Sequence, residues 1–208
     1  MIIAVDGPTA SGKGTIAKAL AAHYGLPHLD TGLLYRAVGR QVFLDGGDPG
    51  DAGDALAGTA FPDGLLTDPE LRSETSGGLA SRVSVHAPVR QALYERQRAF
   101  ATRPGGAVLD GRDIGTVIAP DATVKLFVTA SVDIRARRRW KEMQARGESV
   151  TLAEIEEDLR RRDERDRTRA EAPLRAAEDA IVLDTSDLGP EAAIAAAIAA
   201  VETKRAGK

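Results

Sequence analysis

A glycine-rich segment near the start of the chain, GPTASGKGT over residues 7–15, carries the residues best suited to chemistry. Its glycines permit backbone conformations that other residues avoid, so successive N–H groups can turn inward around an anion. Lys13 adds a full positive charge on a flexible stem, which can follow a phosphoryl group while it is transferred. The pattern predicts a loop that binds the phosphates of a nucleotide.

The elements on either side of this loop fit that prediction. A short apolar run at residues 2–5 precedes it, and apolar residues then recur at helical spacing: Ile16, Leu20 and Tyr24. The order is strand, loop, helix, so the helix would point its free N-terminal amides at the phosphates. Gly14 stands where the general motif has a serine or threonine that holds the metal ion. Thr15 is the nearest hydroxyl, and we expect it to hold Mg²⁺ through water.

A second charged cluster follows another predicted strand. Ala107–Leu109 is a strand core that ends in the sequence DGRD, residues 110–113. In a parallel α/β sheet, ligands collect beyond the carboxyl ends of the strands. A buried salt bridge between Arg112 and a neighbouring carboxylate would be a purely structural alternative. The phosphate loop in the same predicted sheet favours a functional role.

The third candidate is a highly charged helix, EIEEDLRRRDERDRTRAEAP, residues 154–173. Ile155 and Leu159 are almost its only apolar residues, so it cannot be a core helix. Arg162, Asp166 and Arg169 fall at i, i+4 and i+7 and share one face. A solvent-exposed helix laced with salt bridges is one interpretation. The other is a lid that brings arginines onto phosphates and excludes water, and the phosphate loop favours it.

Length and composition bound the remaining possibilities. The 208 residues suffice for one α/β domain with insertions, and the net charge of −3 gives no support to nucleic-acid binding. The absence of cysteine excludes disulfides and thiolate metal sites within the chain. We see no signal peptide and no apolar run of membrane-spanning length, and therefore expect a cytoplasmic protein with no membrane or nucleic-acid partner.

Two further segments are predicted from local composition. Asp45–Gly64 is rich in glycine, aspartate, proline and alanine, which predicts a linker or a loosely structured insert. The basic run from Arg135 to Lys141 lies on a predicted helix with acidic residues nearby, so most of it is expected to form a solvated face. Further strands are predicted within residues 26–30, 124–128 and 181–183, and a last helix is predicted to begin near Pro190.

Five stretches taken together resemble the bacterial cytidylate kinases. They are GPTASGKGT (7–15), DTGLLYRA (30–37), ASRVSVHAPVRQALYERQRAF (80–100), DGRDIGTVIAPDATVKLFV (110–128) and RRDERDRTRAEAPL (161–174). Many kinases share the phosphate loop, whereas DGRDIGT combined with the last stretch is far more specific.

The resemblance implies transfer of the γ-phosphoryl group of ATP to CMP or dCMP, with Mg²⁺, in pyrimidine nucleotide metabolism. The ATP phosphates would be held by Gly7, Pro8, Thr9, Ala10, Ser11, Gly12, Lys13, Gly14 and Thr15. The cytosine would be bound by Thr31, Ser81, Arg90 and Asp113. Phosphates would be held or bridged by Arg36, Arg112 and Arg169, and the ribose of the acceptor would be met by Arg162 and Asp166. The charges expected to act in catalysis are Lys13, Arg112, Arg162 and Arg169.

The implied fold is α/β, a three-layer P-loop fold with a central parallel sheet of about five strands, a helical lid and a short acceptor-binding insert. The core would comprise residues 1–36, 89–145 and 173–208, the acceptor-binding subdomain residues 37–88, and the lid residues 146–172. The family usually carries a longer insert with its own small sheet. Here residues 45–75 are shorter, so we expect that sheet to be reduced or missing.

Three alternatives stay open at this point. A related kinase acting on UMP or AMP would share the phosphate loop and differ in the base pocket. A P-loop ATPase or switch is disfavoured as a GTPase, because the sequence contains neither DxxG nor NKxD. Nucleic-acid binding through the basic run is disfavoured by the net acidity. A monomer is expected.

Overall fold

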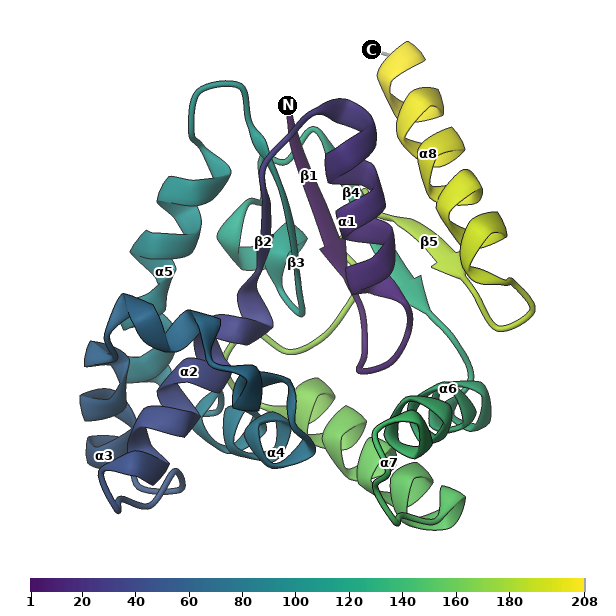
Figure 1. Cartoon of the computed structure of the whole chain (residues 1–208). Helices are drawn as coiled ribbons and strands as arrows, with labels where there is room; N and C mark the ends of the chain where they lie inside the picture. The colour runs from purple at the N-terminus through teal and green to yellow at the C-terminus, as the bar shows by residue number, and fades with distance from the viewer. Residues whose placement is uncertain (208) are drawn as a thin grey trace. The chain divides into compact units, whose positions relative to one another are not determined.

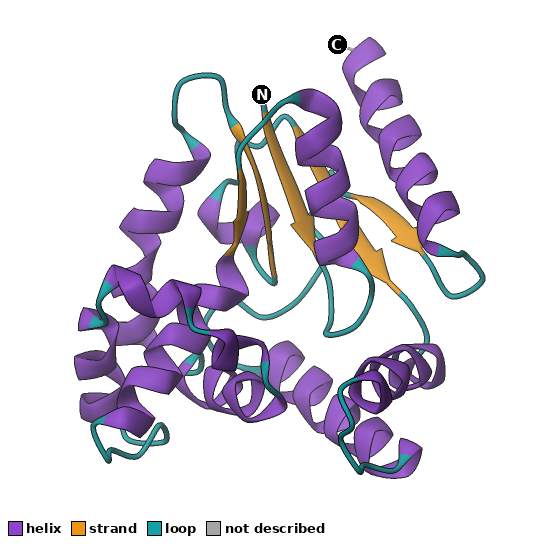
Figure 2. Ribbon diagram, viewed as in Figure 1, coloured by secondary structure: helices purple, strands orange, loops and turns teal. Residues whose placement is uncertain are grey.

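The computed structural model describes residues 1–207, and the chain forms two compact units (Figures 1 and 2). The first unit is Met1–Leu29 with Arg103–Lys208, and the second is Asp30–Thr102. Residues 30–36 and 89–102 therefore lie in the second unit, although the sequence pattern grouped them with the core. The predicted lid residues lie in the first unit.

The first unit is built on a five-stranded sheet in the order β2-β3-β1-β4-β5. The strands are β1 (Ile2–Asp6), β2 (His28–Asp30), β3 (Ala107–Gly111), β4 (Val124–Thr129) and β5 (Ile181–Asp184). Strand β1 pairs in parallel with β3 and β4, and β4 pairs in parallel with β5. The predicted parallel sheet is confirmed. Because β1 is central, the loop that follows it leaves the sheet where the strand order changes direction.

One face of this sheet is covered by α1 (Lys13–Tyr24) and α8 (Pro190–Ala206), shown in Figure 1. Ile16 and Leu20 of α1 pack with Ile3 and Leu126 of the sheet, and all four side chains are almost completely buried. Full burial of one such side chain contributes about 1.5–3 kcal/mol. This core fixes the strand and the helix that flank the glycine-rich loop.

Two further helices of the first unit, α6 (Val132–Ala145) and α7 (Leu152–Thr168), pack against each other. Ile155 and Leu159 of α7 are buried against Ala136 and Met143 of α6. A reciprocal capping box between Thr151 and Glu154 starts α7. Ile155 and Leu159, the two apolar residues that the sequence singles out in this charged helix, are its buried apolar residues.

The regular secondary structure of residues 31–102 in the second unit is helical, and this range contains no strand. Its α-helices are α2 (Thr31–Leu44), α3 (Ala52–Ala57), α4 (Glu74–Val83) and α5 (Ala87–Ala101), and short 3-10 turns connect α3 to α4 at Gly58–Ala60, Asp63–Thr67 and Pro69–Arg72. At Gly39 of α2 a Cβ atom would lie 2.7 Å from Leu79 Cβ of α4, so glycine allows the two backbones to approach closely. The expectation that the small sheet of the insert is missing is confirmed.

The prediction that Asp45–Gly64 is a linker or a loosely structured insert is wrong for residues 52–60, which form α3 and a 3-10 turn. Asp51 caps α3 by accepting hydrogen bonds from the N–H groups of Gly53 and Asp54, and Ala55 and Phe61 are buried. The elements of this segment are one or two turns long. They therefore carry too few apolar residues to show a helical period, and the glycine and proline content dominates the pattern.

Among the described helices, none has the length and apolar character needed to cross a membrane.

Candidate active site

The glycine-rich loop between β1 and α1 has a backbone that depends on glycine at its first position. Gly7 has φ 156°, and a Cβ atom there would lie 2.0 Å from the carbonyl oxygen of Val128. Gly12, the residue before α1, has φ 89°, and a Cβ added there would meet no atom within 4 Å. The loop is therefore fixed at its start and leaves open space at its end, just before the helix N-terminus.

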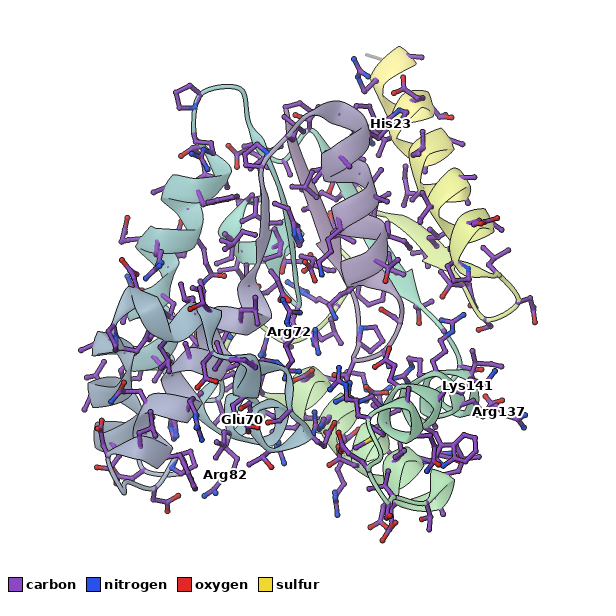
Figure 3. All side chains as sticks on the ribbon, in the orientation of Figure 1. His23, Glu70, Arg72, Arg82, Arg137 and Lys141 are labelled. Carbon is purple, nitrogen blue, oxygen red and sulfur yellow. The ribbon has the colours of Figure 1, made fainter. Side chains whose placement is uncertain are left out.

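A cavity of about 540 Å³ opens beside this loop, and all of its walls belong to the first unit. Residues 10–16 form one wall, α6 contributes Arg138 and Lys141, and the segment after β5 contributes Thr185 and Leu188. Figure 3 labels Lys141 on α6. Pockets that take nucleotide-sized ligands have volumes of about 300–1,000 Å³, so the cavity is large enough for one.

Ser11 gives the cavity an unsatisfied donor. Its side chain is fully buried, and its Oγ has no hydrogen-bond partner within the part of the chain that the structure describes. A buried hydroxyl without a partner is costly, and an anion beside the loop would accept its hydrogen bond. Lys13 Nζ, which donates to the carbonyl oxygen of Pro8 at 3.3 Å, lies at the same loop.

Arg112 of the DGRD segment joins three parts of the first unit. Its Nε donates to Asp166 Oδ2 of α7 at 2.8 Å, and its Nη2 donates to Thr9 Oγ1 of the glycine-rich loop at 2.7 Å. Burial opposes the charge on Arg112, but Asp166, together with Asp110 and Asp163, raises its pKa above the ordinary value. The guanidinium therefore stays charged between the loop and α7.

Asp113 and Arg169 form a second link between the DGRD segment and the end of α7. Both side chains are buried, and Arg169 Nη2 lies 3.9 Å from Asp113 Oδ1. Arg169 directly follows α7, and its Nε donates to the carbonyl oxygen of Ala172 at 2.8 Å. The structure thus brings together four of the predicted residues, Arg112, Asp113, Asp166 and Arg169.

The buried face of α7 carries the remaining predicted residue of this helix. Arg162 and Asp166 are both buried, and Arg162 Nε lies 2.6 Å from Asp158 Oδ2. The other arginines of α7, such as Arg160 and Arg167, are exposed and pair with acidic residues on the same helix. The interpretation of the whole helix as solvent-exposed is therefore wrong for one face and right for the other.

A buried carboxylate connects the glycine-rich loop to the DGRD segment. Asp6, the residue before Gly7, accepts hydrogen bonds from the N–H groups of Ile114 at 2.8 Å and Gly115 at 2.7 Å. Burial raises the pKa of Asp6 to about 7, although the two N–H donors act in the opposite direction. Asp6 thereby holds the turn that directly follows Asp113.

Four predicted residues lie in the second unit, and their contacts are described within it. Arg36 of α2 donates from Nη1 to the carbonyl oxygens of Leu71 at 2.7 Å and Ser73 at 3.0 Å. The Arg90 guanidinium lies 5.7 Å from the centre of the Tyr35 ring, a cation–π distance. The other two predicted residues are Thr31, buried at the start of α2, and Ser81, on α4.

Sequence reasoning missed Arg135, which lies in the basic run predicted to be mostly solvated. Arg135 is buried and forms a two-pronged salt bridge with Asp163 of α7, at 3.1 and 2.6 Å. One signal was available, because Arg135 lies next to Ala136, and Val132 three residues earlier belongs to the same apolar stripe of α6. In a run of consecutive arginines, the sequence alone does not show which side chain faces inward.

Two other polar residues of the site received no individual role from the sequence: Asp110, the first residue of the DGRD cluster, and Thr185. Asp110 Oδ1 lies 2.7 Å from His28 Nε2, and Asp110 Oδ2 lies 3.7 Å from the position that a Cβ atom of residue 14 would occupy. Thr185 is almost completely buried at the wall of the cavity. Their proximity to the glycine-rich loop was not predicted, because strand pairing in the sheet brings both residues to it from distant parts of the chain.

The central position of β1, the glycine-rich loop that follows it and the cavity beside that loop define the P-loop class of α/β nucleotide-binding proteins. Two solved structures have a similar fold. One is an uncharacterized protein from Eubacterium ventriosum, with a TM-score of 0.57, 16% identity and coverage of 98% of this chain and 99% of that chain. The other is a sugar kinase from Janibacter, with a TM-score of 0.50, 18% identity and coverage of 96% and 93%. At these identities the likeness concerns the fold alone.

The family model for cytidylate kinase matches residues 3–203. A cytidylate kinase of Rhodopseudomonas palustris is 56% identical over 100% of this chain and 99% of its own length. One from Xanthobacter autotrophicus is 54% identical over the whole of both chains, and one from Cereibacter sphaeroides is 55% identical over 98% and 96%. The chain therefore belongs to the cytidylate kinase family. Because these relatives have matching lengths, the short insert is not peculiar to this chain.

Proposed function

We propose that the chain transfers the γ-phosphoryl group of ATP to CMP or dCMP and releases ADP with CDP or dCDP. The observation that carries the proposal is the position of Arg112, which joins the phosphate loop to α7. The same loop forms a wall of a cavity of nucleotide size. Membership of the cytidylate kinase family supports the choice of acceptor.

The donor would place its phosphates along residues 7–15. The residues present fit an anion, since Ser11 Oγ has no partner among the described residues and the backbone at Gly12 leaves open space. Lys13 would move from the carbonyl oxygen of Pro8 to the transferred phosphoryl group. The nucleoside part of the donor would occupy the cavity between the loop, α6 and the segment after β5.

The residues beside the loop also fit Mg²⁺ held through water. Thr15 lines the cavity, and the Asp110 carboxylate lies beside Gly14, where the lack of a side chain leaves room. Hydroxyl and carboxylate oxygens are ligands that Mg²⁺ prefers, and the ion usually keeps several waters. Bound there, Mg²⁺ would neutralise negative charge on the donor phosphates.

The acceptor would be bound by the predicted site residues that lie outside the glycine-rich loop. Arg36, Arg112 and Arg169 would hold or bridge phosphates, because arginine forks match phosphate oxygens in pairs. Cytosine would be read by Thr31, Ser81, Arg90 and Asp113, since its edge offers both donor and acceptor atoms. Its ribose would be met by Arg162 and Asp166.

Phosphoryl transfer requires little covalent chemistry from the protein. The acceptor phosphate oxygen is already anionic at neutral pH and is itself the nucleophile, so we infer neither a covalent intermediate nor a strong base. Positioning and charge compensation by Lys13, Arg112, Arg162 and Arg169 would provide the acceleration. Closure of α7 would exclude water, which would otherwise hydrolyse ATP.

A coupled ADP-release assay tests the proposal. ATP and Mg²⁺ are supplied with CMP, dCMP, UMP, AMP or GMP, each separately, beside a control without acceptor. A strong rate confined to CMP and dCMP supports the proposed function. A strong rate with UMP or AMP would identify a different monophosphate kinase, and an equal slow rate in every reaction would identify an ATPase.

A further inference from the structure

The carbonyl groups of the phosphate loop need hydrogen-bond donors of their own. A loop that turns its N–H groups toward an anion must turn carbonyls away from it, and each buried carbonyl needs a donor. Here the Pro8 oxygen accepts from Lys13 Nζ, the Thr9 oxygen from Arg135 Nη1 at 3.2 Å, and the Ser11 oxygen from Thr185 Oγ1 at 3.0 Å. Side chains therefore satisfy three of the loop carbonyls.

Among these donors, Thr185 is the most deeply buried. It directly follows β5, its side chain is 1% exposed, and its N–H donates to the carbonyl oxygen of Thr129 in β4 at 2.8 Å. The hydroxyl lies 3.1 Å from that same oxygen, so the Thr129 carbonyl and the Ser11 carbonyl share its hydrogen bond. Thr185 thus ties the ends of two neighbouring strands to the loop.

Arg138 of α6 fixes Thr185 in turn. Its Nη1 donates to Thr185 Oγ1 at 3.0 Å, and its Nη2 donates to the carbonyl oxygen of Thr185 at 2.5 Å and to that of Leu188 at 3.3 Å. Arg138 Nη1 can only donate to the hydroxyl oxygen, and the two carbonyl oxygens can only accept, so the hydrogen of that hydroxyl is directed toward the carbonyls. The donation to Ser11 is therefore imposed by the surrounding network.

We propose that Thr185 is a positioning residue of the donor site, which holds the Ser11 carbonyl outward and so keeps the loop N–H groups turned toward the phosphates of ATP. The inference rests on the proposed function. Without the hydroxyl, the buried Ser11 carbonyl would lose its donor, and the peptide that follows it would be free to rotate. The cost would fall on ATP binding, because CMP does not bind this loop.

The test compares Thr185→Val, which keeps the shape and removes the hydroxyl, with Thr185→Ser, which keeps the hydroxyl. We expect Thr185→Val to raise the KM for ATP and the calorimetric Kd for ATP about tenfold, which corresponds to about 1.4 kcal/mol. The KM for CMP should change less than twofold. Thr185→Ser should recover ATP affinity to within about threefold of the wild type. Thr203→Val is the matched control, since its hydroxyl is exposed and donates only along α8.

Several outcomes would overturn the inference. ATP affinity of Thr185→Val equal to that of the wild type would show that the hydroxyl is not needed. Equal rises in the KM values for ATP and CMP, or no recovery in Thr185→Ser, would show a general packing role. If the Val variant does not fold, Thr185→Ala is measured and judged in the same way. Failure of the wild type to bind ATP would instead contradict the proposed function.

Discussion

Arg112 and Asp166 lie 54 residues apart in the chain, yet Arg112 Nε donates to Asp166 Oδ2 at 2.8 Å. The same guanidinium donates to Thr9 of the phosphate loop. One side chain therefore contacts both α7 and the loop on which the donor phosphates would lie. The contact with Asp166 therefore holds the guanidinium between α7 and the phosphate loop, where a positive charge could compensate charge on a phosphoryl group.

Replacement of Arg112 should affect the chemical step most strongly. We expect Arg112→Ala to lower kcat by about 10²–10³-fold, the range found when one stabilising donor is removed from a transition state. Arg112→Lys should recover only a small part, because lysine cannot make two parallel hydrogen bonds. Steady-state kinetics with ATP and CMP measures this. Arg137→Ala, at an exposed position of α6 labelled in Figure 3, is the control and should keep full activity.

Asp113 should determine base preference rather than donor binding. Asp113→Ala would remove a carboxylate that we propose reads the cytosine edge, and hydrogen bonds to charged groups contribute about 1.5–3 kcal/mol. The ratio of kcat/KM for CMP to that for UMP should therefore fall about 10–100-fold, while the KM for ATP stays within about twofold. An unchanged ratio in the variant would remove Asp113 from the base pocket.

Asp6 should give the free energy of unfolding a measurable pH dependence. Burial raises its pKa from 3.8 to about 7, so between these values the folded chain binds a proton that the unfolded chain has released. Its contribution to stability is complete below about pH 4 and is lost as the pH rises through 7. Asp6→Asn removes this titration. From pH 4.5 to 6.5 the wild type should lose up to about 1.4 kcal/mol per pH unit more than the variant in urea unfolding. Parallel pH profiles for the two proteins would contradict the assignment.

The Arg135–Asp163 pair should stabilise the contact between α6 and α7. Its nitrogen and oxygen atoms are 2.6 Å apart, and both side chains are largely buried. Asp163→Ala leaves a buried guanidinium without its carboxylate, for which we expect a loss of about 3 kcal/mol in unfolding free energy. Glu164→Ala, the next residue, removes a surface pair with Arg167 and should cost less than about 0.5 kcal/mol. Similar losses in both variants would show that burial of the first pair is unimportant.

Much of the fold could be predicted because its signals are local. The run Ile2–Val5, the glycines that follow it and the helical spacing of Ile16 and Leu20 lie within a few turns of one another. The pairing of α7 with α6 was harder to see, since a charged helix carries only Ile155 and Leu159 as apolar anchors. The short elements after Asp45 escaped prediction because their stability comes from caps such as Asp51 rather than from an apolar period.

The contacts around the candidate site could be predicted only in part. The resemblance singled out Arg112, Asp113, Asp166 and Arg169, and the structure brings these four together. It did not indicate Thr185 or Arg135, whose task is to satisfy carbonyls of the phosphate loop. Every residue has a backbone carbonyl, so the sequence does not show which of them needs a side-chain donor. That donor can be identified only from the folded structure.

The second unit enters the chain as one continuous insertion, residues 30–102, and the strands on either side of it, β2 and β3, are neighbours in the sheet. The entropic cost of bringing these two strands together depends on the length of the insertion between them. The entropy of closing a loop grows only with the logarithm of its length, so doubling the insertion costs about 0.6 kcal/mol. Evolution can therefore lengthen, shorten or replace the insertion while the strand pairing that supports the phosphate loop is preserved.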